Sequence, residues 1–280
     1  MDRNNKHKYP LHPLLRNYIE YIYFVPEVTV REGFIPVMPD CMTELVISLR
    51  GSSERNFGSG CIEKISRSHF VGMKSRSQQL KLGASLKKVG IRFKPGGALM
   101  FADFDMNELT DCVVDASEIF SNEILELENK IGESSDVPFI IKNVEDFLIA
   151  RYKANQKVIE LREILKIIYD NPAETKIENI KERTGTYYKQ LERSFSRVLG
   201  IHPKLFMRIV KFNYATKLIY EHLDKPLTEI AYESGYYDQS HFIKTFKELS
   251  GMKPKDYFPF SSPRIASNQA ITNRLFHFLP

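Results

Sequence analysis

The sequence predicts an α+β fold with an N-terminal small β-barrel or sandwich that carries helices, followed by an all-α part. Three observations predict it: short β-branched segments before residue 100, apolar residues at helical spacing after residue 115, and a helical pattern that occurs twice after residue 175. The chain has 280 residues, and one domain usually takes about 100–200. We therefore expect an N-terminal domain over 1–154, a second domain over 155–260 and a tail over 261–280.

The composition is typical of a globular protein. Hydrophobic residues make up 42% of the chain and charged residues 27%, which excludes a collagen, a wholly disordered chain and a disulfide scaffold. No apolar run approaches the ~20 residues of a membrane helix, and the polar N-terminus lacks a secretory signal. The three cysteines lack CxxC spacing. We expect a cytoplasmic protein without a membrane span, a structural metal or a cofactor.

Charge is distributed unevenly along the chain. Residues 1–150 contain 18 Lys and Arg against 21 Asp and Glu, whereas residues 151–260 contain 20 against 14. A basic C-terminal part indicates a polyanionic partner, although many basic domains are merely soluble.

Two strands stand out in the first half. Residues 43–49 are rich in β-branched residues and lie between Pro39-Asp40 and Gly51. Residues 88–93 alternate, which predicts that Val89, Ile91 and Phe93 share one face. Residues 94–97 then end the strand, and residues 57–60 indicate a loop.

Helical patterns follow. Apolar residues from Ile119 to Ile131 predict a first helix, residues 139–152 a second and residues 158–169 a third. We place the domain boundary near residue 154, between the second and third helices.

An internal repeat is the most informative feature of the second half. Residues 195–206 and 246–257 share a phenylalanine, a glycine, a proline and a closing aromatic residue, all at an offset of 51. In each copy a short helix (about 176–183 and 227–234) ends at a glycine, Gly185 or Gly235, and a second helix (about 187–199 and 238–250) follows. This is the anatomy of a helix-turn-helix, whose second helix enters the DNA major groove. A long helix over 203–223 would separate the two units.

Residues 227–246 read LTEIAYESGYYDQSHFIKTF, and Gly251-Met252-Lys253-Pro254 follows. This stretch resembles the second helix-turn-helix of the AraC/XylS family of bacterial transcription regulators, and the resemblance covers about residues 155–258. The segments at Pro39-Asp40, 70–72 and 89–97 are similar to a poorly characterised domain found ahead of some AraC-type domains.

One position departs from the family pattern. Family members carry a small residue four before the turn glycine; Ala231 fits, but Lys181 must extend to solvent or loosen the first unit.

Seven residues are candidates for reading DNA bases. They lie opposite the apolar face of the two second helices, at positions that match the base-contacting positions of the family: Lys189, Glu192, Arg193, Gln239, Ser240, Ile243 and Lys244. Arg193 and Lys244 can donate to guanine, Gln239 can bind adenine, and Ile243 can pack on a thymine methyl. The alternative for each is a solvated helix face. Two units on one rigid helix would span major-groove segments about 34 Å, or ~10 bp, apart.

The resemblance implies a sequence-specific DNA-binding transcription regulator, modulated by its N-terminal domain. Double-stranded DNA is the expected partner; a small-molecule effector, RNA polymerase and a second copy of the chain are further candidates. No catalytic residues can be nominated.

Two other hypotheses stay open: an interaction module whose N-terminal domain senses a protein, and an enzyme with a helical targeting part. A closed apolar pocket favours the effector-binding regulator, an exposed apolar patch the interaction module, and clustered titratable groups the enzyme. The apolar tail over 261–280 is expected to pack back on the protein.

Overall fold

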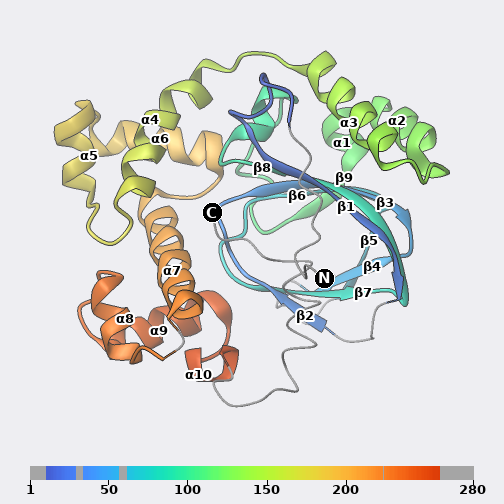
Figure 1. The fold of residues 1–280 in the computed structure, drawn as a ribbon. Helices are drawn as coiled ribbons and strands as arrows, with labels where there is room; N and C mark the ends of the chain where they lie inside the picture. The colour runs from blue at the N-terminus through green and yellow to red at the C-terminus, as the bar shows by residue number, and fades with distance from the viewer. Residues whose placement is uncertain (1–10, 30–33, 57–61, 223, 259–280) are drawn as a thin grey trace.

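Two β-sheets stacked face to face form the N-terminal part of the structure (Figure 1). This computed structural model describes residues 11–29, 34–56, 62–222 and 224–258. The larger sheet has the strand order β1-β8-β3-β6-β9 and the smaller has the order β2-β7-β4-β5. The strands of the larger sheet are β1 (Ile19–Thr29), β8 (Ser85–Phe93), β3 (Thr43–Arg50), β6 (Ser68–Val71) and β9 (Val113–Asp115). The strands of the smaller are β2 (Phe34–Val37), β7 (Gln78–Leu82), β4 (Ser53–Asn56) and β5 (Ile62–Ile65).

The described strands stay in two separate sheets, so the sandwich prediction is confirmed and the barrel alternative is wrong. The larger sheet is buried on both faces. Val89, Ile91 and Phe93 share the predicted apolar face, which packs into the main core. The opposite face looks onto the smaller sheet, and β8 presents Lys88 and Arg92 there.

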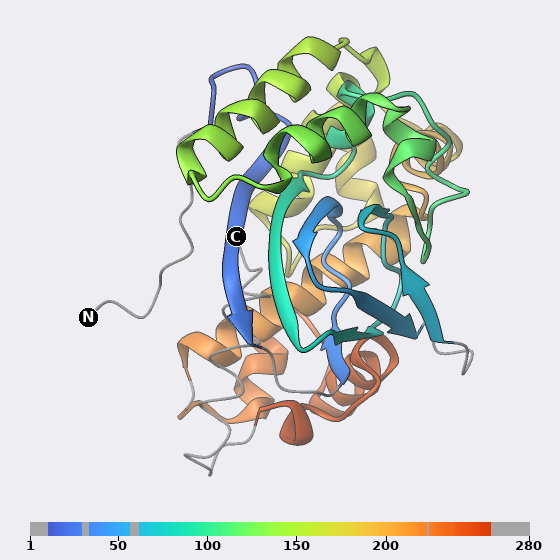
Figure 2. The same ribbon diagram turned by 90° about the vertical axis from the view of Figure 1, so that its right-hand side faces the viewer.

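Three helices cover one end of this sandwich (Figures 1 and 2). They are α1 (Ala116–Phe120), α2 (Glu123–Gly132) and α3 (Val137–Arg151), and a short 3₁₀ helix, η1 (Gly97–Met100), precedes them. The expectation of one helix from Ile119 to Ile131 is wrong. The chain turns at Ser121, whose φ of 59° is incompatible with a continuous helix.

The C-terminal part is all-helical and contains the predicted repeat. α4 (Gln156–Asp170) leads into α5 (Ile177–Thr184) and α6 (Tyr188–Leu199), the first helix-turn-helix. After α7 (Pro203–Glu221), α8 (Leu227–Glu233) and α9 (Gln239–Ser250) form the second, and the short α10 (Pro254–Tyr257) follows. The two units lie at opposite ends of α7 (Figure 1).

One continuous hydrophobic core joins the two parts of the chain, because its buried residues run from Leu11 to Phe258. None of the described helices is long and apolar enough to cross a membrane. The expected loop at 57–60 and the tail over 261–280 lie outside the described residues.

Candidate nucleic-acid interface

α7 holds both second helices of the repeat at a fixed separation. In α6, Phe195 is fully buried with its ring 5.4 Å from that of Phe206 on α7. In α9, Phe246 is fully buried with its ring 5.1 Å from that of Phe212, further along α7. The predicted inward faces are confirmed, since these buried residues belong to them: Leu191, Phe195, Val198, Phe242, Phe246 and Leu249.

The turn in each unit depends on a glycine in the left-handed region. Gly185 has a φ of 69° and Gly235 a φ of 75°, values that side chains disfavour. Ala231 is fully buried, as its family position requires. Lys181 is exposed, with its ammonium 5.2 Å from the centre of the Tyr187 ring, so the first unit accommodates a lysine by extending it into solvent.

In the first unit, the candidate residues lie on the first half of α6. Lys189 and Arg193 are exposed. Glu192 is half-buried beside the Tyr188 hydroxyl, and its carboxylate raises the pKa of that phenol. Arg193 and Glu192 also line an open hollow against the N-terminal part.

In the second unit, the candidate residues lie on the first half of α9. Ser240 and Lys244 are exposed. Gln239 is half-buried, and its Oε1 accepts a hydrogen bond from Thr228 Oγ1 of α8 (2.9 Å). Ile243 is half-buried and packs against the core, which leaves only part of its side chain for a ligand. Contacts of all seven residues with bases stay a prediction.

The opposite ends of both helices are held by the N-terminal part. Thr110 Oγ1 donates to the carbonyl oxygen of Gly200, which ends α6 (2.8 Å). Ser77 donates from its backbone amide to the carbonyl of Leu249 (2.8 Å) and from its hydroxyl to that of Ser250 (2.9 Å), at the end of α9.

Asp111 connects these two contacts. Its Oδ1 accepts a hydrogen bond from the Ser75 amide (2.8 Å), and its other oxygen accepts one from the Ser75 hydroxyl. We call the set formed by Ser75, Ser77, Thr110 and Asp111 the clasp. The clasp binds the carboxyl ends of the two helices and leaves their amino-terminal halves, which carry the candidate residues, exposed.

An acidic loop of the N-terminal part lies beside α6. We define it as residues 103–108, which include Asp105 and Glu108. Ser196 of α6 donates to Asn107 Oδ1 (2.6 Å), and Asp105 and Asn107 line the same hollow as Arg193 and Arg197. The Asn107 amide donates to Asp105 and, with Arg197 nearby, lowers the pKa of the Asp105 carboxyl. Negative charge therefore stands close to the helix that would approach phosphate.

Sequence reasoning gave no role to two exposed tyrosines of the second unit. The exposed fraction is 85% for Tyr237, just before α9, and 59% for Tyr232 on α8. A large aromatic side chain left exposed at the start of a recognition helix can donate its hydroxyl to phosphate. The Gly-Tyr-Tyr sequence of the turn was the feature of the sequence that could have indicated an exposed tyrosine there.

Comparisons with known proteins agree with this geometry. A family described as a helix-turn-helix domain matches residues 180–259, which span both units except for the start of α5. The chain carries an AraC-type helix-turn-helix domain. Ahead of this AraC-type domain, a domain of unknown function (DUF6597) matches residues 7–115, as the resemblance of the N-terminal segments predicted.

Two curated relatives match about half of the chain at low identity. Two uncharacterized HTH-type transcriptional regulators of Staphylococcus aureus, from strains MSSA476 and MRSA252, are 23% identical over 155 residues, which is 53% of this chain. The match spans only 20% of the length of each relative.

Solved structures resemble the chain more weakly. ToxT from Vibrio cholerae superposes with a TM-score of 0.49 at 11% identity, over 86% of this chain and 99% of that one. The AraC-like transcriptional activator CuxR gives a TM-score of 0.27 at 12% identity, over 76% and 81%. At this level of similarity the solved structures carry no functional argument.

Proposed function

We propose that this chain is a sequence-specific DNA-binding regulator of transcription, which reads two successive major-groove segments with α6 and α9. The observation that carries the proposal is the pair of matched helix-turn-helix units on one helix, α7, with the amino-terminal half of each second helix exposed. The amino-terminal residues of a recognition helix are those that contact base edges.

The side chains suit that task. Arg193 and Lys244 occupy matching positions in the two copies, and both are exposed cations able to donate to guanine O6 and N7. Gln239 offers an amide to adenine. Lys189, Glu192, Ser240 and Ile243 complete the proposed reading surface, with Tyr237 as a phosphate contact.

The N-terminal part modulates binding in this proposal. The clasp fixes the carboxyl ends of both recognition helices, and the acidic loop places carboxylates next to α6. Phosphate approaching α6 would be repelled by these carboxylates until the N-terminal part moves. The clasped arrangement is therefore the weaker DNA-binding state.

The remaining proposals concern domains and partners. We place the sensing domain at 1–154, the DNA-binding domain at 155–260 and a tail at 261–280. Duplex DNA in the cytoplasm is the proposed ligand of the second domain, with RNA polymerase and a second copy of the chain as partners. An effector is proposed for the first domain, and no catalytic activity is assigned.

The test is a selection of genomic DNA fragments with the purified chain, repeated with Arg193→Ala and Lys244→Ala at two salt concentrations. Wild type should enrich a bipartite motif whose halves lie about one helical turn apart. Each variant should relax a different half and lose about 1–3 kcal/mol of binding free energy. Lys247→Ala, which removes an exposed lysine from the last turn of α9, is the matched control and should keep both halves.

The contrary result is equally clear. If fragments are enriched without a motif and binding only weakens with salt, the basic part is a non-specific polyanion binder. The alternative of an interaction module whose N-terminal domain senses a protein partner would then replace this proposal.

A further inference from the structure

An open hollow lies between the two helix-turn-helix units, beside the middle of α7. Its volume is about 660 Å³, and it is lined by the end of α4, the segment before α5, α5 itself, α7 and the turn of the second unit. Lys211, on its wall, stands at the middle of α7. Arg183 lies five residues before α6 begins, and Gly235 lies four residues before α9 begins. The hollow is therefore close to the amino ends of the two recognition helices, whereas the clasp binds their carboxyl ends.

Direct contacts between the two units fix the shape of the hollow. The turn of the second unit packs on the segment before α5, because a Cβ at Gly235 would come within 2.1 Å of the Ala173 carbonyl oxygen. Lys211 Nζ donates to the Gly235 carbonyl oxygen (3.0 Å) and lies 5.8 Å from the centre of the Tyr236 ring. These contacts place α7, the turn and the first unit in one arrangement before any ligand binds.

Three cations from different segments line the hollow. They are Lys176 just before α5, Arg183 near the end of α5, and Lys211 on α7. The ion pairs described for the all-helical part use other cations, namely Lys166, Arg208 and Lys225. Burial and the positive charge of Lys176 both lower the pKa of Lys211. The two ammonium groups therefore repel one another across the hollow, and an anion between them would relieve that repulsion.

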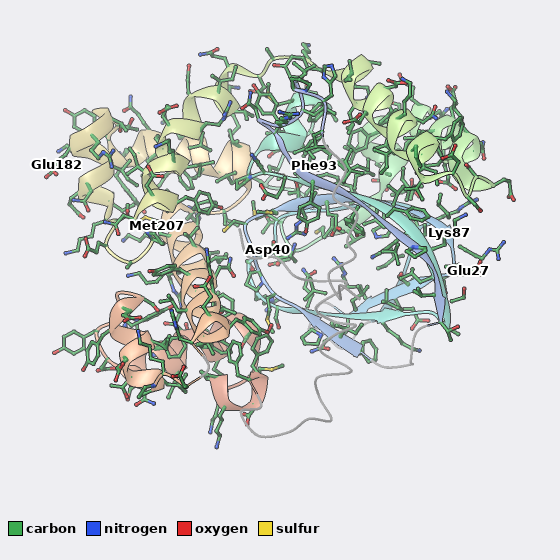
Figure 3. The ribbon with its side chains drawn as sticks, in the orientation of Figure 1. Glu27, Asp40, Lys87, Phe93, Glu182 and Met207 are labelled. Carbon is green, nitrogen blue, oxygen red and sulfur yellow. The ribbon has the colours of Figure 1, made fainter. Side chains whose placement is uncertain are left out.

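Negative charge on the wall of the hollow is small. Among the described residues that line it, Glu174 is the one carboxylate. Glu174 is exposed and accepts a hydrogen bond from the Asn171 side chain (3.2 Å). On α5, Ile180 is fully buried, and Glu182 lies on the outer side of the helix, away from α7 (Figure 3). The hollow therefore has a net positive charge.

We propose that this hollow binds the sugar-phosphate backbone of duplex DNA where it passes from one major-groove segment to the next. Two major-groove segments one helical turn apart are separated by the minor groove, whose flanking phosphates would face the middle of α7. Ammonium and guanidinium donors suit phosphate oxygens. The hollow is open, which suits a backbone that enters and leaves it, whereas a small free ligand is usually enclosed over most of its surface.

This inference rests on the proposed function and adds to it a contact that does not depend on base sequence. All the described residues that line the hollow belong to the all-helical part, whereas the acidic loop belongs to the N-terminal part. The backbone contact is therefore available in the clasped arrangement as well, before α6 is released to approach its bases.

The first experiment measures by fluorescence anisotropy how the affinity of the full chain for its selected DNA falls with salt. Each phosphate contact contributes about 0.9 to the slope of log K against log salt concentration. Lys211→Met and Lys176→Gln should each lower the slope by about that amount and keep the bipartite motif. Because Lys211→Met also removes the bond to Gly235, Lys176→Gln tests the charge alone. Lys157→Gln, which also removes an exposed lysine at the start of a helix, should keep the wild-type slope.

The second experiment replaces each phosphate between the two halves of the motif, one at a time, by an uncharged methylphosphonate. At the phosphate that occupies the hollow, the replacement should weaken binding by wild type. It should weaken binding by Lys211→Met less, because that variant has already lost the contact.

Wild-type slopes in both variants would overturn the site, and so would methylphosphonate losses that are the same in Lys211→Met as in wild type at every position. If the slopes are unchanged but inorganic phosphate raises Tm in wild type and not in Lys211→Met, the hollow binds a free anion instead. A bipartite motif alongside either result leaves the proposed function standing. Enrichment of fragments without a motif would reject the proposed function and this inference with it.

Discussion

At the scale of single residues, the glycines that end helices differ in what surrounds them. Gly185 and Gly200 both have left-handed backbones, with φ of 69° and 72°. A Cβ at Gly185 would meet nothing within 4 Å, whereas a Cβ at Gly200 would overlap the carbonyl oxygen of Met106 in the N-terminal part. A substitution at Gly185 therefore tests backbone strain alone, whereas one at Gly200 also tests the contact between α6 and the N-terminal part.

Gly185→Ala should cost about 1–2 kcal/mol of unfolding free energy from strain alone. Gly200→Ala should cost more, because α6 must also move away from Met106. Urea denaturation of the two variants measures both values. Equal losses would show that the contact at Gly200 contributes nothing.

His69 makes stability depend on pH. Its pKa is lowered to about 3 in the folded chain by burial, with Arg55, Lys88 and Asp115 also facing it; an unfolded histidine titrates near 6.5. Between these values the unfolded chain binds more protons, so unfolding free energy falls as pH drops from 6.5 toward 3. His69→Asn should remove up to about 1.4 kcal/mol per pH unit from the fall in unfolding free energy between pH 6.5 and 4. The profile of Tm against pH, which measures this, should be flatter over that range. An unchanged profile would contradict a neutral buried imidazole.

The sequence predicted one face of β8 and missed the other. Val89, Ile91 and Phe93 mark an apolar face by their spacing, but this spacing assigns no environment to Lys88 and Arg92 on the other face. In the structure a second sheet covers them. The sequence does show an excess of basic residues here, since residues 51–100 contain ten Lys and Arg against two Asp and Glu. That excess does not tell whether the basic side chains are buried between the sheets or exposed to solvent.

At the scale of elements, the repeat was predictable because each helix has local start and stop signals. α6 and α9 begin and end within one residue of expectation, owing to Gly200 and Gly251 at their ends. The break between α1 and α2 was not predictable, because it falls at Ser121, where no glycine or proline marks it. The repeat was enough to predict the seven candidate residues. It could not predict that the acidic loop lies beside those on α6.

The acidic loop should weaken DNA binding by α6. Asp105→Asn combined with Glu108→Gln should tighten binding a few fold at low salt, because two exposed carboxylates no longer face the phosphates, and salt should screen the gain. Fluorescence anisotropy with a labelled site measures it. Glu126→Gln on α2 combined with Glu133→Gln just after α2 removes two exposed carboxylates on the other side of the molecule and is the charge-matched control (Figure 1). Tighter binding by the control as well would point to net charge alone.

At the scale of the whole molecule, the clasp should hold the chain in its weaker binding state. Ser77→Ala with Thr110→Val removes one hydrogen bond to the carboxyl end of each of α6 and α9. Each bond contributes about 0.5–1.5 kcal/mol, so Tm should fall and affinity for the selected DNA should rise. Lower affinity in the double variant would indicate instead that the clasp orients the two units for DNA.

The contacts between the two parts could not be read from the sequence. Ser77 and Thr110 show no pattern that pairs them with helix ends about 90 to 170 residues away, because such contacts depend on how the folded parts meet. Charge asymmetry and the repeat indicated that there would be two parts, and they did not indicate a shared core.

That shared core affects how the protein can be handled and made. The backbone at Gly96 packs against Val158 and Val198, and the Cys41 thiol approaches the Phe206 carbonyl on α7. A fragment cut near residue 154 would carry an apolar surface whose covering lies on the other fragment. During synthesis on the ribosome, the first part exposes the same apolar surface until the second part has been made. Separately expressed halves should aggregate alone and become soluble when co-expressed.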